Sequence, residues 1–291
     1  MSDIKHCFTS RFEGGSILEA DYSQLEVIVL AHLSNDFQLK ADLLSGMDMH
    51  RVRAAELFDI PEDDVTSKQR KIAKAFSFQL QYGAGAPSMA EKNEQPEALA
   101  KKFIENFYAR YPDVKAWQER VKADVEASRR PSKKQTKLGR TAGVGFITSE
   151  TGRNYVFFED DNPYYNPSAK WGKSSKSATN FSPTKMKNYP VQGMATGDIV
   201  PMMLGELFEE LMSHPEYKEN VLLINTVHDS VMFDCKFTDE RKIEEVGSWI
   251  KNIMEFAPTR LKEHFDIAFE LPLTVEVEAG STWGELKKLD I

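Results

Sequence analysis

The stretch Ser16-Ile-Leu-Glu-Ala-Asp21-Tyr-Ser-Gln-Leu-Glu26 joins a short apolar run to a segment with helical spacing. The apolar run predicts a strand over 16–20 that ends on Asp21. From Ser23 onward the apolar residues recur every three or four positions, which predicts a helix with Ser23 as a candidate N-cap. Because a carboxylate at the end of a buried strand is costly without a cation beside it, Asp21 is a candidate site residue.

A second aspartate lies in a similar place near the other end of the chain. The apolar runs 221–227 and 231–233 are separated by His228-Asp229-Ser230, which predicts two strands joined by a tight turn. Taken singly, Asp21 and Asp229 are typical of a cap and a turn. Taken together, they could meet at one sheet edge and hold Mg²⁺ through carboxylate oxygens. Two such ions can activate an attacking hydroxyl and neutralise a leaving phosphate.

Between the two aspartates, a helix over 68–82 carries cations and aromatic rings at a spacing of four. Arg70, Lys74, Phe78 and Tyr82 therefore follow one slowly winding stripe, and Gly83 is a candidate C-cap. An amphipathic helix with solvated cations and buried rings would give this pattern. A strip that grips a triphosphate and offers rings to a sugar and a base would give it too. The helix alone leaves both interpretations open.

The remaining sequence predicts strands near both ends of the chain and helices between them. Helices are expected to start at Asp48 and Thr66, and others at 95–108, 112–127, 193–213 and 239–264; one hairpin is expected at 144–158. Further strands are expected at 4–10 and 273–277. This order favours an α+β fold in which one antiparallel sheet is interrupted by a large, mostly helical insertion.

The amino-acid composition indicates which classes of protein this chain can belong to. The 291 residues are 41% hydrophobic and 28% charged, as in ordinary soluble globular proteins. Two cysteines, Cys7 and Cys235, cannot make a disulfide framework, and no apolar stretch reaches the length of a membrane span. We expect a cytoplasmic protein without a membrane partner. The net charge of -8 argues against a chain that coats nucleic acid through bulk charge.

The charge is unevenly distributed along the chain. Between Arg129 and Lys187, twelve Lys and Arg residues face four Asp and Glu residues, so this window carries +8 and the remainder carries -16. Eight aromatic residues share the window. A solvated loop would explain the charge, whereas cations interleaved with aromatic rings are what phosphate binding with base stacking requires.

Taken in order, three motifs resemble motifs A, B and C of family A DNA polymerases. They are Asp21-Tyr-Ser-Gln-Leu-Glu26, the stripe from Arg70 to Gly83, and Val227-His228-Asp229. Further matches in the family's order are Asp48-Met-His50-Arg51, Ala54-Ala55-Glu56, Tyr111-Pro112, Asn188-x-Pro190-x-Gln192-Gly193 and Glu278-Ala-Gly280-Ser-Thr-Trp283. The resemblance covers almost the whole chain.

The resemblance implies a template-directed DNA polymerase that acts on dNTPs and primer-template DNA. Asp21 and Asp229 would hold two Mg²⁺ ions, for which Mn²⁺ can substitute, and Lys74 would be catalytic as a candidate proton donor to pyrophosphate. Glu26 would be a steric gate against a 2′-hydroxyl. The residues implied to bind the dNTP are Gln24, Glu26, His50, Arg70, Lys74, Phe78 and Tyr82. The residues implied to contact DNA are Asn188, Gln192, His228 and Arg153.

Three positions depart from the family pattern. Val27-Ile28 stands where the family usually has Leu-Arg, so a polar contact there is lost or replaced. Ser230 stands where an acidic residue is common, a form also familiar from single-subunit RNA polymerases. Thr184 stands where an arginine is often found.

By the resemblance, 1–32 is the first part of the palm with motif A, 33–180 is the fingers, and 181–291 is the rest of the palm with motif C. Only about 20 residues precede Asp21, so the thumb and the proofreading exonuclease are expected to be absent. We expect a second polypeptide to carry them, as in a split polymerase of phage type that works in the host cytoplasm. An expression fragment is the alternative.

Two rival functions remain open at this point. One is a catalytically silent DNA-binding or scaffold subunit of a replication complex. The other is a relative of the single-subunit RNA polymerases. Glu26 and Phe78 count against the second rival, since a steric gate makes sense only for deoxynucleotides.

Overall fold

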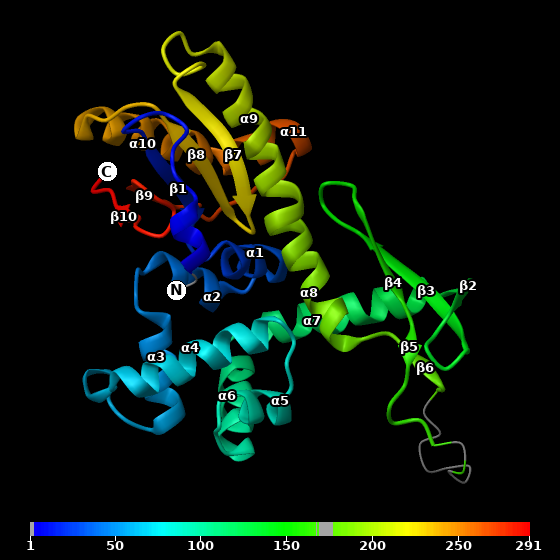
Figure 1. Ribbon diagram of the computed structural model, residues 1–291. Helices are drawn as coiled ribbons and strands as arrows, with labels where there is room; N and C mark the ends of the chain where they lie inside the picture. Colours follow the sequence, from blue (N-terminus) through cyan, green and yellow to red (C-terminus); the bar gives the residue numbers. More distant parts are fainter. Residues whose placement is uncertain (1–2, 167, 169–176) are drawn as a thin grey trace. The chain divides into compact units, whose positions relative to one another are not determined.

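The computed structural model describes residues 3–166, 168 and 177–291, and these form two compact units (Figure 1). One unit combines Met1–Ile28 with Gly193–Ile291, and the other is Val29–Gln192. The ranges inferred from the sequence placed these boundaries after residues 32 and 180. Of the cations and aromatic residues between Arg129 and Lys187, four lie outside the described residues: Lys170, Trp171, Lys173 and Lys176.

The first unit is built on an antiparallel sheet with the strand order β10-β9-β1-β8-β7 (Figure 1). Its strands are β1 (Ser16–Tyr22), β7 (Val221–Val227), β8 (Ser230–Cys235), β9 (Val275–Gly280) and β10 (Lys287–Lys288). The central strand β1 buries Ile17, Leu18 and Ala20, and every residue of β8 is buried. The structure thus confirms the predicted antiparallel sheet formed from both ends of the chain.

Three helices of this unit are α9 (Val200–Ser213), α10 (Glu240–Glu255) and α11 (Ala257–Phe265). Helix α10 packs on β1 and β9 through an apolar stripe that includes Ile243, Val246, Ile250 and Met254. The single helix predicted over 239–264 is wrong in one respect: it is broken into α10 and α11, with a proline in the first turn of α11 that cannot donate a backbone hydrogen bond.

The strand predicted at 4–10 is also wrong. Residues Asp3–Cys7 form the 3₁₀ helix η1, and sheet pairing in this stretch is limited to one isolated bridge between Thr9 and Thr282. The ammonium of Lys5 lies 4.2 Å from the ring of Trp283, and the Trp283 backbone N–H donates to the Phe8 carbonyl. Side-chain packing against Trp283 therefore takes the place of a strand ladder.

In the residues that the structure describes, the second unit contains most of α1 (Leu25–Ser34), most of α8 (Pro183–Met194), and six helices between them. These are α2 (Phe37–Leu44), α3 (Met49–Phe58), α4 (Ser67–Gln81), α5 (Ala86–Lys92), α6 (Glu97–Arg110) and α7 (Pro112–Ala127), with the short η2 (Glu62–Asp64) before α4. Asp48 caps α3, and Thr66 forms a capping box with Gln69 at the start of α4, so both predicted helix starts are confirmed. Phe76 and Phe103 meet edge to face in the core between α4 and α6.

A small sheet follows α7. It is formed by β2 (Arg130–Gln135), β3 (Thr141–Thr148) and β4 (Asn154–Phe158), and a separate pair joins β5 (Asp160–Asp161) to β6 (Thr179–Asn180). The hairpin predicted at 144–158 is confirmed, whereas β2 was not expected. Helix α7 packs on β3, where a side chain at Gly145 would come within 2.5 Å of the Val125 carbonyl oxygen.

One helical run crosses the boundary between the units. It begins as α8 (Pro183–Met194), passes through a π-helical turn, η3 (Ala195–Ile199), and continues as α9. The helix therefore starts ten residues before the position predicted from the sequence, Gly193. Among the residues that the structure describes, no helix combines the length and apolar character that a membrane span requires.

Candidate active site

Asp21 and Asp229 lie at the same end of neighbouring strands. In the ladder between β1 and β8, Asp21 stands directly opposite Ser230, the residue that follows Asp229. Opposed residues of an antiparallel pair have Cα atoms about 4.5–5.5 Å apart. On its other side, Asp21 faces Glu276 of β9. The fold thus brings together the two aspartates that the sequence singled out.

The electrostatic surroundings of this pair are unfavourable for two ionised carboxylates. Partial burial raises the pKa of Asp21 to about 6, and repulsion from Asp229, Glu19, Glu276 and Glu278 acts in the same direction. Burial raises the pKa of Asp229 as well, opposed by a backbone hydrogen bond and by His228. A cation bound between the two carboxylates would relieve the repulsion.

The donor set fits a hard divalent cation that is only partly held by protein. Within the described ranges, no group of three or more His, Cys, Asp or Glu side chains is arranged to hold a metal ion. Mg²⁺ is commonly bound by one or two carboxylates, with water and substrate phosphates completing its six oxygen ligands. Asp21 and Asp229 match that pattern.

Mg²⁺ binding should therefore depend on pH. Since the folded protein holds the Asp21 proton up to about pH 6, and a metal ligand must lose its proton, apparent Mg²⁺ affinity should fall about tenfold per unit below pH 6. Thermal stabilisation by Mg²⁺, titrated at several pH values between 8 and 5, measures this. Asp21→Asn should weaken Mg²⁺ binding at every pH in this range, and equal Mg²⁺ affinity of the parent at both ends of the range would contradict the prediction.

Ser230, one of the three departures, has a direct structural role. Its hydroxyl donates to one carboxylate oxygen of Glu19 at 2.9 Å, and the Trp283 indole donates to the other at 3.1 Å. An acidic residue at 230 would face the Glu19 carboxylate instead. Glu19 itself was missed in the sequence, although its position two residues before Asp21 on one strand places both on the same face.

The backbone is strained beside each aspartate. Gln24, between β1 and α1, has φ +56°, and His228, the first residue of the two-residue turn before β8, has φ +58°. A non-glycine residue with positive φ destabilises the fold by roughly 1–3 kcal/mol, so it persists only where the surrounding structure holds the backbone in that conformation. Glu26 follows in the first turn of α1 and is half-buried.

Ile28 is the departure from the family pattern in this helix. Its side chain is buried, which suits an apolar residue better than an arginine.

In the second unit, helix α4 exposes the stripe that the sequence predicted. Lys74, Phe78 and Tyr82 are exposed, with 43% of Phe78 and 41% of Tyr82 open to solvent, while Phe76 and Leu80 are buried. The interpretation with buried rings at 78 and 82 is therefore wrong. The Lys74 ammonium lies 5.7 Å from the Phe78 ring centroid. Cations and rings together form an open surface, as ligand binding requires.

His50 contributes a neutral ring to this surface. Its centroid lies 6.0 Å from that of Phe78. Partial burial lowers the pKa of His50 to about 4, and the positive charges of Arg53, Lys74 and Arg70 add to the effect. Its Nδ1 atom is buried without a hydrogen-bond partner in the part of the chain that the structure describes. A neutral imidazole can offer one N–H to a phosphate oxygen.

Arg70 is oriented by Asp48. Its Nε donates to Asp48 Oδ2 at 2.6 Å, while the Asp48 carboxylate also accepts the backbone N–H groups of His50 and Arg51. Although burial acts in the opposite direction, these bonds lower the pKa of Asp48. Because the contact uses Nε, both terminal nitrogens of Arg70 stay available to a phosphate.

With the dNTP substrate that the family resemblance implies, Asp48→Asn should raise the KM for dNTP about threefold to tenfold, with a smaller change in kcat. Asparagine keeps the cap of α3 but loses the charge that holds Arg70, so more side-chain freedom must be lost on binding. Steady-state primer extension at varied dNTP measures both constants. A matched control is Asp59→Asn, which removes an exposed carboxylate at the other end of α3. An unchanged KM would refute the positioning role.

The end of α4 is fixed by Thr184, the third departure. Gly83 has φ +76°, and a side chain there would come within 2.9 Å of the Thr184 Cα. The Thr184 hydroxyl donates to the Gly83 carbonyl at 3.1 Å. Thr184 thus holds the turn that follows Tyr82, a role that a longer arginine would not fill in the same way.

The candidate DNA contacts are distributed over both units. Asn188 and Gln192 lie four residues apart on α8 and so share a face, and Asn188 Oδ1 is buried without a partner among the described residues. Arg153 lies in the exposed turn between β3 and β4. His228 belongs to the first unit with Asp21, Gln24, Glu26 and Asp229, whereas the stripe on α4 and His50 belong to the second.

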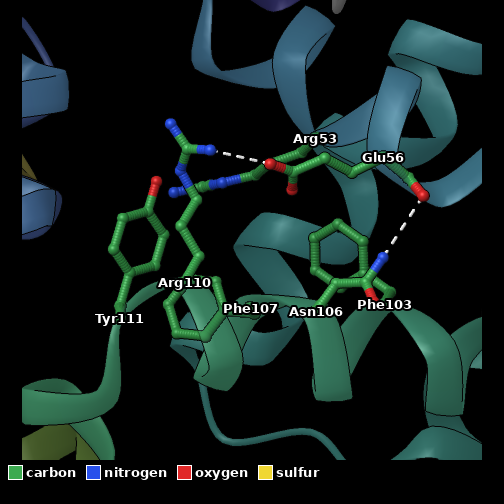
Figure 2. Close-up of a pocket in the computed structure, with 7 residues that line it drawn as sticks. All are labelled: Arg53, Glu56, Phe103, Asn106, Phe107, Arg110 and Tyr111. Atoms are coloured by element: carbon green, nitrogen blue, oxygen red, sulfur yellow. Dashed lines mark hydrogen bonds and ion pairs between the residues drawn. The ribbon is translucent and has the colours of Figure 1, made fainter.

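Residues of α3 and α6, with Tyr111, form a polar and aromatic cluster that lines a small cavity (Figure 2). The buried guanidinium of Arg53 donates to Ser77 at 2.9 Å and lies over the rings of Phe107 and Tyr111. Arg110 of α6 forms an ion pair with Glu56 of α3, with 2.7 Å between Nη1 and Oε1 (Figure 2). The cluster ties α3 and α6 to the helix that carries Phe78, so it is a support for the stripe.

Comparison with known protein families accounts for both the aspartate pair and the stripe on α4. The model of DNA polymerase family A matches residues 1–285. The chain belongs to DNA polymerase family A. Such polymerases work with divalent metal ions, in agreement with the carboxylate pair. The mixed fold, a helical insertion in an antiparallel sheet, is that of a family A polymerase domain.

Individual DNA polymerases are also similar to this chain. The chain is 30% identical over 273 residues to DNA polymerase I of Pseudomonas aeruginosa, covering 94% of this chain and 25% of that protein. It is 29% identical to the thermostable DNA polymerase I of Thermus aquaticus, covering 98% and 29%. Among solved structures, the POL domain of Pol1 from M. smegmatis, in complex with DNA primer-template and dNTP, matches with TM-score 0.63 and 23% identity over 96% of this chain and 42% of that one. The chain thus spans between a quarter and a third of these curated relatives.

Proposed function

We propose that this chain is the catalytic part of a DNA-directed DNA polymerase, which adds dNTPs to a primer 3′-hydroxyl under direction of a template. The observation that carries the proposal is the pair Asp21 and Asp229 at one end of β1 and β8, mutually repulsive and suited to a cation. Family membership over residues 1–285 supports the same chemistry.

In this mechanism, Asp21 and Asp229 would hold two Mg²⁺ ions, for which Mn²⁺ can substitute. When bound, the metal would lower the pKa of the primer hydroxyl and neutralise charge on the phosphates. Arg70, Lys74 and neutral His50 bind the triphosphate, and Lys74 donates a proton to the leaving pyrophosphate. The other dNTP contacts are Gln24, Glu26, Phe78 against the deoxyribose and Tyr82 beside the templating base.

Duplex binding is the second part of the proposal. Asn188, Gln192, His228 and Arg153 contact primer-template DNA, and phosphate contacts supply most of the affinity of such complexes. We propose that a further polypeptide with thumb and exonuclease domains supplies the remaining grip. The chain matches 25% to 29% of the length of these curated relatives.

Primer extension with Mg²⁺ and dNTPs tests the proposal. The chain is assayed alone and after capture of its binding partners from the native host. Activity confined to the captured complex would support the two-chain arrangement, and robust processive synthesis by the chain alone would contradict it. DNA binding without extension in either arm would favour a silent scaffold, while preferential extension with rNTPs would favour an RNA polymerase.

Glu26→Ala should raise ribonucleotide incorporation. The half-buried Glu26 side chain begins α1, immediately after the strained turn at Gln24, and would occupy the space of a 2′-hydroxyl. Relief of a built-in clash should increase kcat/KM for rNTP about tenfold or more while dNTP use falls only modestly. Single-nucleotide extension with each nucleotide measures the ratio, and an unchanged ratio would refute the gate.

A further inference from the structure

The small sheet of the second unit has one covered face and one open face. Across β3 and β4, Gly145 pairs with Phe157, and these positions lie on the covered face, where Phe157 is 2% exposed. The neighbouring pairs, Val144 with Phe158 and Phe146 with Val156, point the opposite way because side chains alternate along a strand. On that face Val156 is 46% exposed, and both phenylalanine rings are partly exposed.

Two cations from β2 lie over these rings. The guanidinium of Arg130 is 5.4 Å from the Phe146 ring centroid, and the ammonium of Lys134 is 4.2 Å from that of Phe158. Arg130 is paired in register with Val144, so it belongs to the same open face. Two aromatic rings on adjacent strands, each beside a cation, thus form one exposed surface.

The acidic residues near this sheet neutralise other cations. Each carboxylate in the run 159–161 has its own partner: Glu159 pairs with Arg129, Asp160 with Lys185, and Asp161 with Arg140. Across the described ranges, no carboxylate forms an ion pair with Arg130, Lys133 or Lys134, all of them exposed. The open face therefore carries uncompensated positive charge beside its rings.

We propose that this open face binds single-stranded DNA. Bases stack on Phe146 and Phe158 or on the Arg130 guanidinium, and Arg130 and Lys134 contact the phosphates. An acidic protein segment could match the charge, but it would leave the paired rings without a role, whereas every base has a face that stacks. The face lies on β2, β3 and β4, apart in sequence from the aspartates and the α4 stripe, and it needs neither metal nor dNTP.

The proposal rests on the proposed polymerase function and deepens it, because it assigns a ligand to the positively charged segment between Arg129 and Lys187. In the setting of DNA synthesis, the ligand is the unpaired template strand. From the sequence, Arg153 was a candidate DNA contact by itself, and Arg130, Lys134 and Phe158 belonged to the window whose cations and rings suit phosphate binding with base stacking; Phe146 was not singled out.

The test is fluorescence anisotropy of the full chain with a labelled oligothymidine of about 20 nucleotides, in EDTA and without primer or dNTP. Phe158→Ala and Lys134→Gln should each weaken Kd about tenfold, and Lys134→Gln should also reduce the salt dependence of binding. Phe158→Tyr should retain affinity because the ring can still stack. Since Lys134 is exposed, its variant tests the proposal even if Phe158→Ala fails to fold.

Two matched controls separate stacking from bulk effects. Val156→Ala trims the same face without removing a ring, and Lys115→Gln removes an exposed charge from α7. Both should bind as the parent does. Absence of oligothymidine binding by the parent, or equal losses in Lys115→Gln and Lys134→Gln, would overturn the proposal. Because the assay contains no metal, a failed primer-extension experiment would leave this result unaffected, and the reverse also holds.

Discussion

Asp21→Asn is expected to lower the rate of primer extension by at least about 10³-fold and to raise the melting temperature of the metal-free protein at pH 7.5. The first effect follows because a catalytic metal supplies several kcal/mol of charge stabilisation, and about 1.4 kcal/mol is worth a factor of ten in rate. Asparagine is nearly isosteric with aspartate but carries no charge to hold the cation.

The second effect follows from the direction of the pKa shift. The pKa of Asp21 is about 6 in the folded protein against 3.8 for the ordinary side chain, so the folded state binds its proton more tightly than the unfolded state. Ionised Asp21 therefore destabilises the fold above pH 6, and this penalty disappears as the pH falls from 6 to about 4. A neutral amide should remove the penalty at pH 7.5.

The pairing of the two effects makes the experiment decisive, since lost activity with increased stability cannot be attributed to unfolding. Asp229→Asn should behave in the same way, because burial raises the pKa of Asp229 too. Glu276→Gln, opposite Asp21 on β9 and paired with Lys288, is the matched control and should keep activity within a few fold. Extension at near-parental rates by either aspartate variant would refute the metal assignment.

Local signals in the sequence were sufficient for much of this site. The alternation from strand to helix at Asp21, the side-chain caps at Asp48 and Thr66, and the tight turn at Asp229 are each encoded by a few adjacent residues. Their physical causes, burial of an apolar run and satisfaction of unpaired backbone N–H groups, act over one or two turns of chain. The order of these elements then favoured one interrupted sheet, which the structure confirms.

Features that depend on distant partners were not predictable in this way. Whether Phe78 and Tyr82 are buried or exposed depends on which face of α4 packs against α3 and α6, and periodicity alone fits both. The strand β2 has a proline and several cations, and it is ordered by pairing with β3 rather than by its own apolar pattern. Glu19 acquires its role only through Ser230 and Trp283, more than 200 residues away.

The three departures from the family pattern also depend on partners that are distant in the sequence. From the sequence, Ile28, Ser230 and Thr184 were only missing family residues. The structure gives each a compensating contact: a buried position for Ile28, a hydrogen bond to Glu19 for Ser230, and a hydrogen bond to Gly83 for Thr184. Such compensation depends on side chains that meet in the fold, so a single sequence cannot reveal it.

Lys74→Ala is expected to lower kcat/KM for dNTP addition by about 10²–10⁴-fold, the range typical for loss of a general acid. Lys74 is exposed on α4 beside Phe78, and its charge contributes to keeping His50 neutral. In the proposed mechanism, its removal would take away a positive charge from the triphosphate and a proton from the leaving pyrophosphate. Single-turnover incorporation with varied dNTP separates binding from chemistry.

Lys74→Arg distinguishes the two roles of this residue. Arginine keeps the positive charge but is not deprotonated in proteins, so it should restore dNTP affinity while the rate of chemistry stays at least about tenfold low. Lys68→Ala, which removes an exposed lysine about 120° round the same helix, is the matched control and should change neither constant. If Lys74→Arg keeps the parental rate of the chemical step, Lys74 acts through its charge alone. If Lys74→Ala keeps the parental kinetic constants, Lys74 does not belong to the site, because nothing else in that variant replaces the lost cation.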